Sequence, residues 1–328
     1  MRSRSTARGI QLTELGLGAA QFGNLYSETS DEQAATAVAE AWSDGIRYFD
    51  TAPHYGLGLS ERRLGAALAA YPREQFIVSS KVGRLLVPSP ETADQSDSDG
   101  FRVPADHRRV FDFSRDGVMR SLESTLERSG LDHIDIVYLH DPDEHWEAAS
   151  TTGVGALVEL RDQGIIRAIG VGINQSEMAT RFVRSTDIDL VMIAGRYTLL
   201  EQGALADLLP LAQERNVDIV IAGVYNSGLL SRGRPAAGSK YDYADAPEQL
   251  IDRATRIAQA CERHGVSLPE AAIAFPLLHP AVVSVVIGAR SAEQVASNVA
   301  RYLAPVPPAL WAELAALGLL SPLATTMN

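Results

Sequence analysis

The sequence has very little cysteine and no long apolar run, and no N-terminal leader is expected. A single cysteine in 328 residues excludes an internal disulfide and fits a reducing compartment. No apolar run approaches the roughly 18 residues of a membrane-spanning helix. The basic segment 1–9 is not followed by an apolar stretch, so no signal peptide is expected. These absences predict a cytoplasmic protein without a membrane partner.

Positive charge is also scarce. The formal net charge is −12, whereas a nucleic-acid-binding surface requires a basic patch. The composition, 46% hydrophobic and 21% charged, is that of an ordinary globular protein. A chain of this length buries enough surface to fold without a disulfide or a structural metal. The one cysteine, Cys261, shares helical spacing with apolar neighbours and is expected in the core. Composition therefore argues against a nucleic-acid partner, says little about a small-molecule substrate, and leaves the oligomeric state open.

Short apolar runs alternate with amphipathic stretches along almost the whole chain. One amphipathic stretch places Ala35, Val38, Ala39 and Trp42 on a stripe, between a capping-box pair (Ser30 and Gln33) and the terminator Gly45. Further helices are expected around 118–126 and over 291–302, the latter with capping-box spacing between Ser291 and Gln294. Eight strands are expected: Leu15–Ala20, Ile46–Asp50, Phe76–Lys81, Ile134–His140, Ala168–Gly172, Leu190–Ala194, Asp218–Ala222 and Val283–Gly288.

Uninterrupted strand–helix alternation predicts an α/β fold with a parallel sheet, and eight units in one chain favour a closed (β/α)8 TIM barrel. The alternative, a doubly wound open sheet, is disfavoured because the segment from Gly16 to Gln21 lacks the third glycine of the dinucleotide-binding fingerprint. Residues 1–328 are expected to form one domain. Long loops follow the third and seventh strands, at 84–113 and 223–247, and a disordered insertion at 91–100 is an equal alternative.

Three consecutive strands end in an ionisable residue: Asp50, Lys81 and His140. In a barrel these strands are neighbours about 4.8 Å apart, and their carboxyl ends open into one mouth. Tyr55, in the loop after Asp50, can fold back over the same point. A nearby Lys81 cation would favour the tyrosine phenolate and make Tyr55 a general acid and base. Asp50 would neutralise Lys81, and His140 would orient a substrate oxygen.

Taken singly, each of these residues has a structural explanation, such as a buried ion pair or a satisfied polar group. Their coincidence at strand ends favours a catalytic tetrad. The motifs around them, Tyr48-Phe-Asp-Thr-Ala-Pro-His-Tyr-Gly56, Ser79-Ser-Lys-Val-Gly83 and Tyr138-Leu-His-Asp-Pro142, resemble those of the aldo-keto reductases. The resemblance runs from about residue 15 to about residue 298. It implies an NAD(P)-dependent oxidoreductase in which hydride passes between nicotinamide and a substrate carbon.

The resemblance also implies a cofactor site. Asn174 would hold the carboxamide, Tyr197 would stack on the nicotinamide, and the loop 223–230 would cover the pyrophosphate. A helix N-terminus after the last strand would hold the adenosine phosphate. The implied cofactor residues are Gln21, Asn174, Tyr197, Tyr225, Ser227, Gly228, Leu230, Gly288, Arg290, Gln294 and Asn298. Because Gly288 and Gln294 stand where NADP-dependent members carry basic residues, NAD is the expected cofactor, with NADP tolerated.

Within the family, the sequence is similar to a bacterial branch of L-fucose, L-galactose and D-threo-aldose 1-dehydrogenases that also contains a pyridoxal 4-dehydrogenase. This branch implies oxidation of an aldose at C1 to a lactone, with pyridoxal oxidation or general carbonyl reduction as alternatives. His54 and Trp146 are the expected substrate-binding residues.

Two alternatives come from other classes. A metal-dependent barrel hydrolase could use the ligand-rich segment from His140 to His145, but the first strand lacks a His-x-His pair and Lys81 would enter the metal site. No metal is therefore expected. A cofactor-sensing barrel without turnover is the other alternative, which an intact tetrad does not favour.

Overall fold

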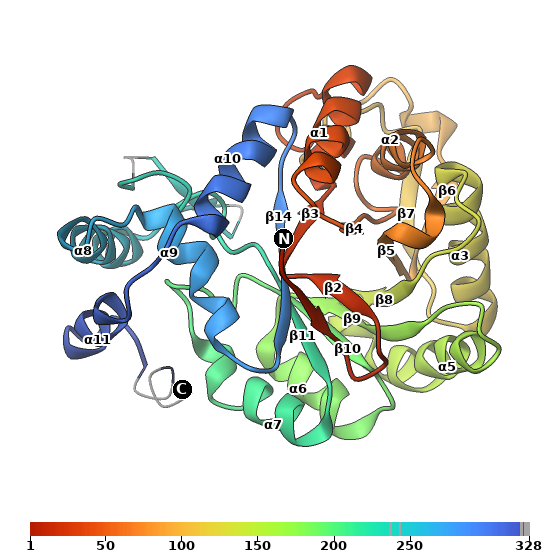
Figure 1. The fold of residues 1–328 in the computed structure, drawn as a ribbon. Helices are drawn as coiled ribbons and strands as arrows, with labels where there is room; N and C mark the ends of the chain where they lie inside the picture. The colour runs from red at the N-terminus through yellow and green to blue at the C-terminus, as the bar shows by residue number, and fades with distance from the viewer. Residues whose placement is uncertain (236–237, 243, 322–323, 325–328) are drawn as a thin grey trace.

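A closed barrel of parallel strands forms the centre of the molecule, with helices around it (Figure 1). The computed structural model describes residues 1–235, 238–242, 244–321 and 324. Each strand expected from the sequence is present, and the last pairs with the first through Val285–Leu15 and Gly288–Gly18. In order around the barrel the strands are β3 (Leu15–Gly18), β4 (Tyr48–Asp50), β5 (Ile77–Val82), β8 (Ile136–His140), β9 (Ala168–Ile173), β10 (Leu190–Ala194), β11 (Asp218–Ala222) and β14 (Val282–Gly288).

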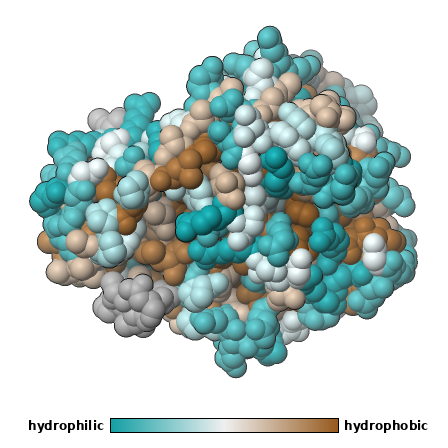
Figure 2. All heavy atoms as spheres, in the orientation of Figure 1, coloured by the Kyte–Doolittle hydropathy of each residue, from teal (hydrophilic) through white to brown (hydrophobic). Residues whose placement is uncertain are grey.

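The interior of the barrel is filled by side chains. Side chains alternate across each strand, so one set points inward and the other packs under the helices. The inner set includes Tyr48, Tyr138 and Met192, and the two tyrosine hydroxyls lie 3.3 Å apart. On the outside, hydrophilic side chains cover most of the face seen in Figure 2, with hydrophobic ones in small patches between them.

The helices form where the sequence predicts them, with two differences of detail. Ser30 and Gln33 form the predicted capping box, whereas Gln294 accepts from the Arg290 N–H and only Ser291 caps the later helix. The buried face of the first helix is Ala34, Ala37, Val38 and Ala41, which shares only Val38 with the predicted stripe. Alanines flank Val38 on both sides, so the apolar pattern alone does not decide which side of the helix faces the core.

Cys261 is fully buried on α8, as expected. The helices longer than one turn are α1 (Asp31–Ser43), α2 (Leu59–Leu68), α3 (Arg115–Ser129), α5 (Val154–Asp162), α6 (Ser176–Ser185), α7 (Leu208–Arg215), α8 (Glu248–Arg263), α9 (Leu268–Ala274), α10 (Ala292–Leu303) and α11 (Pro308–Ala316), and the short α4 is Trp146–Ala148.

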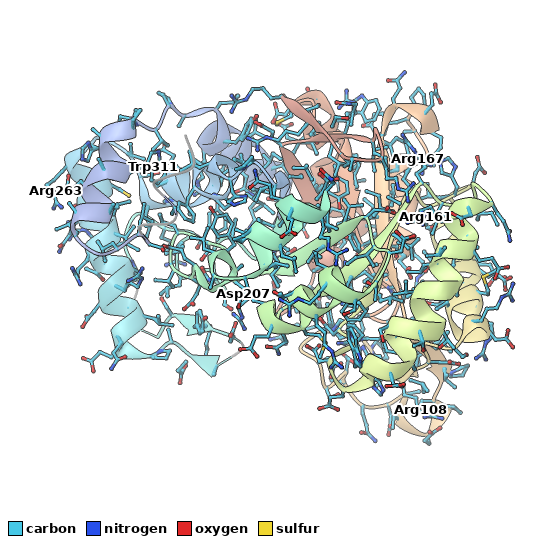
Figure 3. All side chains as sticks on the ribbon, turned by 90° about the horizontal axis from the view of Figure 1, so that it is seen from below. Arg108, Arg161, Arg167, Asp207, Arg263 and Trp311 are labelled. Atoms are coloured by element: carbon cyan, nitrogen blue, oxygen red, sulfur yellow. The ribbon has the colours of Figure 1, made fainter. Side chains whose placement is uncertain are left out.

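The long connection after β5 is a structured hairpin rather than a disordered insertion. Its strands are β6 (Arg84–Pro88) and β7 (His107–Phe111), and Arg109 binds Asp97 at 2.5 Å within the 91–100 segment. In Figure 3, Arg108 marks this hairpin at the end of the barrel opposite Arg167. The second long loop carries the short strands β12 (Lys240–Tyr241) and β13 (Ala244–Asp245), while residues 236, 237 and 243 lie outside the described chain.

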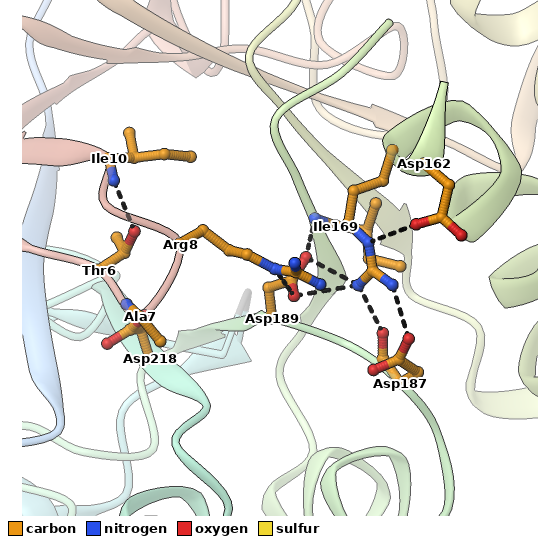
Figure 4. Close-up of polar contacts among 10 residues, drawn as sticks. Thr6, Ala7, Arg8, Ile10, Asp162, Ile169, Asp187, Asp189 and Asp218 are labelled. Carbon is orange, nitrogen blue, oxygen red and sulfur yellow. Dashed lines mark hydrogen bonds and ion pairs between the residues drawn. The ribbon is translucent and has the colours of Figure 1, made fainter. Parts of the chain in front are cut away.

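The amino-terminal hairpin, β1 (Ser3–Ser5) and β2 (Gln11–Thr13), closes the other end of the barrel (Figure 1). Its turn is fastened by ion pairs and hydrogen bonds (Figure 4). Arg8 binds Asp189 at 2.6 Å, Arg161 binds the same carboxylate at 3.0 Å, and the Ala7 N–H donates to Asp218 at 2.8 Å. The open mouth is therefore at the carboxyl ends of the strands, where the ionisable residues lie.

Asp218→Asn is expected to stabilise the protein at neutral pH. Burial, together with the neighbouring Asp189, raises the pKa of Asp218 to about 6. A carboxyl group with a raised pKa in the folded state costs stability when ionised, and this cost disappears as pH falls through that pKa. The amide would still accept the Ala7 N–H. Thermal unfolding should show Tm higher by about 1–3 °C at neutral pH and no gain in acid.

Asp252→Asn, at an exposed position on α8, is the control and should leave Tm unchanged at either pH. A lower Tm for Asp218→Asn at neutral pH would show that the ionised carboxylate is needed to hold the hairpin.

Candidate active site

The four residues predicted to act together meet at the open mouth. Asp50 ends β4, Lys81 lies near the end of β5 and His140 ends β8. Lys81 Nζ donates to Asp50 Oδ2 at 2.7 Å and to the Thr51 carbonyl at 2.9 Å. The Tyr55 ring centroid lies 4.8 Å from Lys81 Nζ and 6.1 Å from the centroid of the His140 ring. Tyr55, Lys81 and His140 line a cavity of about 420 Å³.

A close approach of two backbone segments places Tyr55. Gly56, with a φ of 61°, packs directly against Gly23. A Cβ on Gly56 would lie 2.3 Å from the Gly23 carbonyl oxygen, and one on Gly23 would lie 2.5 Å from the Tyr55 carbonyl carbon. A side chain at either glycine would therefore push the Tyr55 loop away from Lys81.

Burial and charge set the protonation states at the mouth. Burial lowers the pKa of Lys81, but the adjacent Asp50 carboxylate and Tyr55 together outweigh it and leave that pKa above its ordinary value. Burial raises the pKa of Tyr55, and the Lys81 cation opposes this rise without cancelling it. Burial, and then the Arg84 cation, lower the pKa of His140 well below its ordinary value. The same causes lower the pKa of His54 to about 2.

Tyr55 is thus a phenol at neutral pH, and His140 and His54 are neutral imidazoles. Tyr55 and His140 can both donate to an oxygen atom in the cavity between them, as a carbonyl or alcohol substrate requires. The positive charge of Lys81 lies behind Tyr55, where it favours the phenolate when the proton leaves. The arrangement can therefore pass a proton to or from a substrate oxygen in either direction.

A second cavity of about 390 Å³ adjoins the first, and Leu25, Asn174 and Ala194 line both. Its other lining residues include Gln21 and Gly288. The Gln21 Oε1 is buried without a hydrogen-bond partner among the described residues. A Cβ on Gly288 would lie 2.4 Å from the Gln21 amide, so a side chain at this position would displace the end of the Gln21 side chain. An unsatisfied acceptor and glycine-lined space fit a nicotinamide dinucleotide.

Most of the predicted cofactor residues lie at or beside this second cavity. Tyr225, Ser227 and Gly228 line it, and the Tyr225 hydroxyl donates to Asn298 Oδ1 at 3.1 Å. Leu230 is fully buried behind the loop. Arg290 does not point free into solvent, because its guanidinium donates to Ser27 and to the Leu25 carbonyl.

Tyr197 and Trp146 do not lie where the sequence analysis placed them. Tyr197 is fully buried, with its ring 5.1 Å from that of Phe275, and it lines neither cavity. The chain turns at Gly195, whose φ is 70°, and so Tyr197 cannot stack on a ring in the mouth. Trp146 packs on Phe182 at 4.8 Å between ring centroids and lies outside the first cavity. Of the two predicted substrate contacts, only His54 lines that cavity.

The predicted substrate contacts, His54 and Trp146, did not include residues of the β6–β7 hairpin or Asp141 of the fourth loop. Arg84, Asp99, Phe101 and Asp141 all line the first cavity. Two of them had a visible signal, because Arg84 follows the Lys81 strand and Asp141 directly follows His140. The other two reach the mouth through hairpin pairing that no local pattern announces.

Two features are absent from the part of the chain that the structure describes. No helix among them is both long and apolar enough to cross a membrane. No group of three or more His, Cys, Asp or Glu side chains in those ranges is placed to hold a metal ion.

Comparison with known proteins agrees with this geometry. The model of the Aldo/keto reductase family matches residues 14–318. The chain is 48% identical to a D-threo-aldose 1-dehydrogenase from a Pseudomonas species, over 95% of each chain. It is 40% identical to a pyridoxal 4-dehydrogenase from Microbacterium luteolum, over 95% of this chain and 96% of that one.

A solved aldo-keto reductase from Bacillus halodurans has a TM-score of 0.76 and 25% identity, covering 97% of this chain and 96% of that one. The fold, the residues at the mouth of the barrel and the similar proteins all indicate the same family. This chain belongs to the aldo/keto reductase family and is an oxidoreductase that acts on CH–OH or carbonyl groups with a nicotinamide cofactor.

Proposed function

We propose that this enzyme oxidises an aldose at C1 to its lactone. The observation that carries the proposal is a cavity in which the proton-transferring Tyr55 and His140 share the walls with the polar side chains of His54, Arg84 and Asp141. Such walls suit a hydroxylated ring better than an aliphatic aldehyde. The 48% identical D-threo-aldose 1-dehydrogenase supports the same substrate class.

In the oxidation, Tyr55 as phenolate takes the proton of the anomeric hydroxyl. His140 donates an N–H to the same oxygen and fixes its orientation, and Lys81 stabilises the phenolate before the transfer. Gln21, Asn174 and the 225–228 loop would hold the nicotinamide dinucleotide, which would supply the acceptor for the hydride of C1. We propose Asp50, Tyr55, Lys81 and His140 as the catalytic residues, with Asp50 acting through Lys81.

Pyridoxal is the second candidate substrate. It is a compact polar ring that can present a hemiacetal carbon and close to a lactone, and the 40% identical relative is named for it. The purified enzyme should be incubated with NAD and, separately, L-fucose, L-galactose, D-arabinose, L-xylose and pyridoxal, following reduced cofactor and lactone. Lactone formation from a sugar supports the proposal. Oxidation of pyridoxal alone, or efficient reduction of simple aldehydes with none of the five oxidised, contradicts it.

For the cofactor we propose NAD in preference to NADP, held by Gln21, Asn174, the 225–228 loop and the start of α10. Arg290 is the cation expected to meet a 2′-phosphate, and its guanidinium already donates to Ser27 and Leu25. A phosphate would have to displace these contacts before gaining its own.

The single buried Cys261 is the basis for proposing a reducing compartment, the cytoplasm.

Fluorescence titration should show NAD binding at least about tenfold more tightly than NADP. Arg290→Ala should widen this difference, because the remaining attraction for the 2′-phosphate is lost. Arg256→Ala, on α8 away from both cavities, is the matched control. NADP binding at least about tenfold more tightly in the wild type would overturn the assignment.

A further inference from the structure

One ion pair in the first cavity neither gives nor takes the proton transferred there. Arg84, the first residue of β6, binds Asp141 through Nη2 and Oδ2 at 2.5 Å. Both side chains line the cavity. Arg84 Nη1 also lies 3.4 Å from His54 Nδ1, so the pair joins the hairpin to the walls that carry Tyr55 and His140.

The backbone at Asp141 is in an uncommon conformation. Its φ is 40°, in the left-handed region that only Asn and Asp among residues with a side chain enter readily. Its N–H donates to the Gly172 carbonyl at 2.9 Å, which fixes the residue against β9. This conformation turns the carboxylate back toward the mouth, with Oδ2 at 3.7 Å from His140 Nε2. Strain retained beside a reacting centre points to a use in binding.

The position of the pair sets which substrate group it meets. In the proposed function His140 and Tyr55 hold the reacting oxygen, and Asp141 Oδ2 lies 3.7 Å from His140 Nε2. A substituent on the carbon next to the reacting carbon therefore reaches the Arg84–Asp141 pair. A hydroxyl suits it, because it can donate to the carboxylate while accepting from the guanidinium.

Anionic substituents meet a different environment. Of the described residues lining the cavity, the cations Lys81 and Arg84 are each paired with a carboxylate, at 2.7 Å and 2.5 Å. Arg109, just behind the lining, is likewise held by Asp97 at 2.5 Å and by Asp99 at 3.2 Å. A carboxylate or phosphate on the substrate would have to break one of these pairs, and it would also approach the charges of Asp99 and Asp141.

We propose that Arg84 and Asp141 are specificity-determining residues that select a neutral substrate with a hydroxyl on the carbon adjacent to the reacting carbon. This deepens the proposed function, on which it rests for the sugar as substrate. The pair accepts 2-hydroxy aldehydes and aldoses, and it excludes compounds with an anion at that position.

Three small aldehydes test the proposal through the reductive direction. Propanal has no polar substituent on the adjacent carbon, 2-hydroxypropanal adds one hydroxyl there, and in glyoxylate the adjacent carbon is itself a carboxylate. The measured quantity is kcat/KM for each, expressed relative to propanal. Wild type should prefer 2-hydroxypropanal by about 10- to 100-fold, the usual effect of a hydrogen bond to a charged group, and should use glyoxylate poorly.

Asp141→Asn and Arg84→Gln should both reduce the preference for 2-hydroxypropanal by about tenfold or more. The two variants should differ with glyoxylate. Asp141→Asn frees the Arg84 cation and should raise the relative kcat/KM for glyoxylate, whereas Arg84→Gln should lower that value further. Asn tolerates the left-handed conformation, and so Asp141→Asn is expected to fold. Asp143→Asn, two residues along the same loop and outside the cavity, should keep the wild-type ratios.

Wild type showing no preference for 2-hydroxypropanal, or both variants keeping that preference within about twofold, would overturn the proposal. If one variant does not fold, the other decides through the same ratios. Should wild type prefer 2-hydroxypropanal yet oxidise none of the sugars, the proposed function fails while the specificity of the pair stands.

Discussion

Tyr55→Phe is expected to lower kcat by about 10²- to 10⁴-fold while leaving the dissociation constant of the nicotinamide cofactor nearly unchanged. The phenol alone can exchange the proton at the substrate oxygen, and no other hydroxyl group lies among the described residues that line the first cavity. The ring that packs between His54 and Phe101 remains in the variant. Steady-state kinetics and cofactor titration of the same preparation separate the two quantities.

Tyr197→Phe provides the matched control. It removes the same phenolic oxygen from a tyrosine that lines neither cavity, so turnover should equal that of wild type. A Tyr55→Phe enzyme that keeps more than about half of wild-type kcat would remove Tyr55 from the mechanism. Loss of cofactor binding in Tyr197→Phe would show that the Tyr197 hydroxyl contacts the cofactor, although Tyr197 lines neither cavity.

Lys81→Met should affect both turnover and stability. The variant leaves Asp50 as a buried carboxylate without its cation, since both side chains are at most 4% exposed. Breaking a buried pair in this way costs about 3–5 kcal/mol, which corresponds to a Tm lower by about 5–10 °C. Turnover should fall by about 10²-fold or more, because Tyr55 loses the charge that opposes its raised pKa.

The double variant Asp50→Asn, Lys81→Met separates the two effects. Neutralising the orphaned carboxylate should recover most of the lost Tm, because Asn still accepts from Ser79, which donates to Asp50 at 2.7 Å in the native protein. Turnover should stay low, because no cation is restored. Recovery of turnover together with Tm would mean that Lys81 serves the fold alone.

The sequence was sufficient to predict the barrel and the convergence at its mouth. Three predicted strands end in or near Asp50, Lys81 and His140. These strands indicate both the barrel and the position of the site, because a parallel barrel brings the carboxyl ends of consecutive strands together. Tyr55 was predictable for the same reason, since its loop is short and is held against Gly23.

The residues that shape the substrate end were less predictable. Asp99 and Phe101 come to the mouth from the tip region of a hairpin, whose register depends on pairing between β6 and β7 rather than on local sequence. Tyr197 and Trp146 were misplaced because an aromatic residue after a strand can turn into the mouth or under the helices. The turn at Gly195 directs Tyr197 away from the mouth, and packing on Phe182 does the same for Trp146. Neither feature has a sequence motif.

The pairing of β14 with β3 joins residues 285–288 to residues 15–18, and this seam has a consequence for biosynthesis. Gln21 and Gly288 meet across it, so the second cavity cannot exist until nearly the whole chain has left the ribosome. The four proposed catalytic residues, by contrast, lie within the first 140. Contacts between distant parts of a chain form slowly, because the loop between them must close first. A nascent chain would thus assemble its proton-transfer group before it could hold the cofactor, and dinucleotide binding would report completion of the barrel.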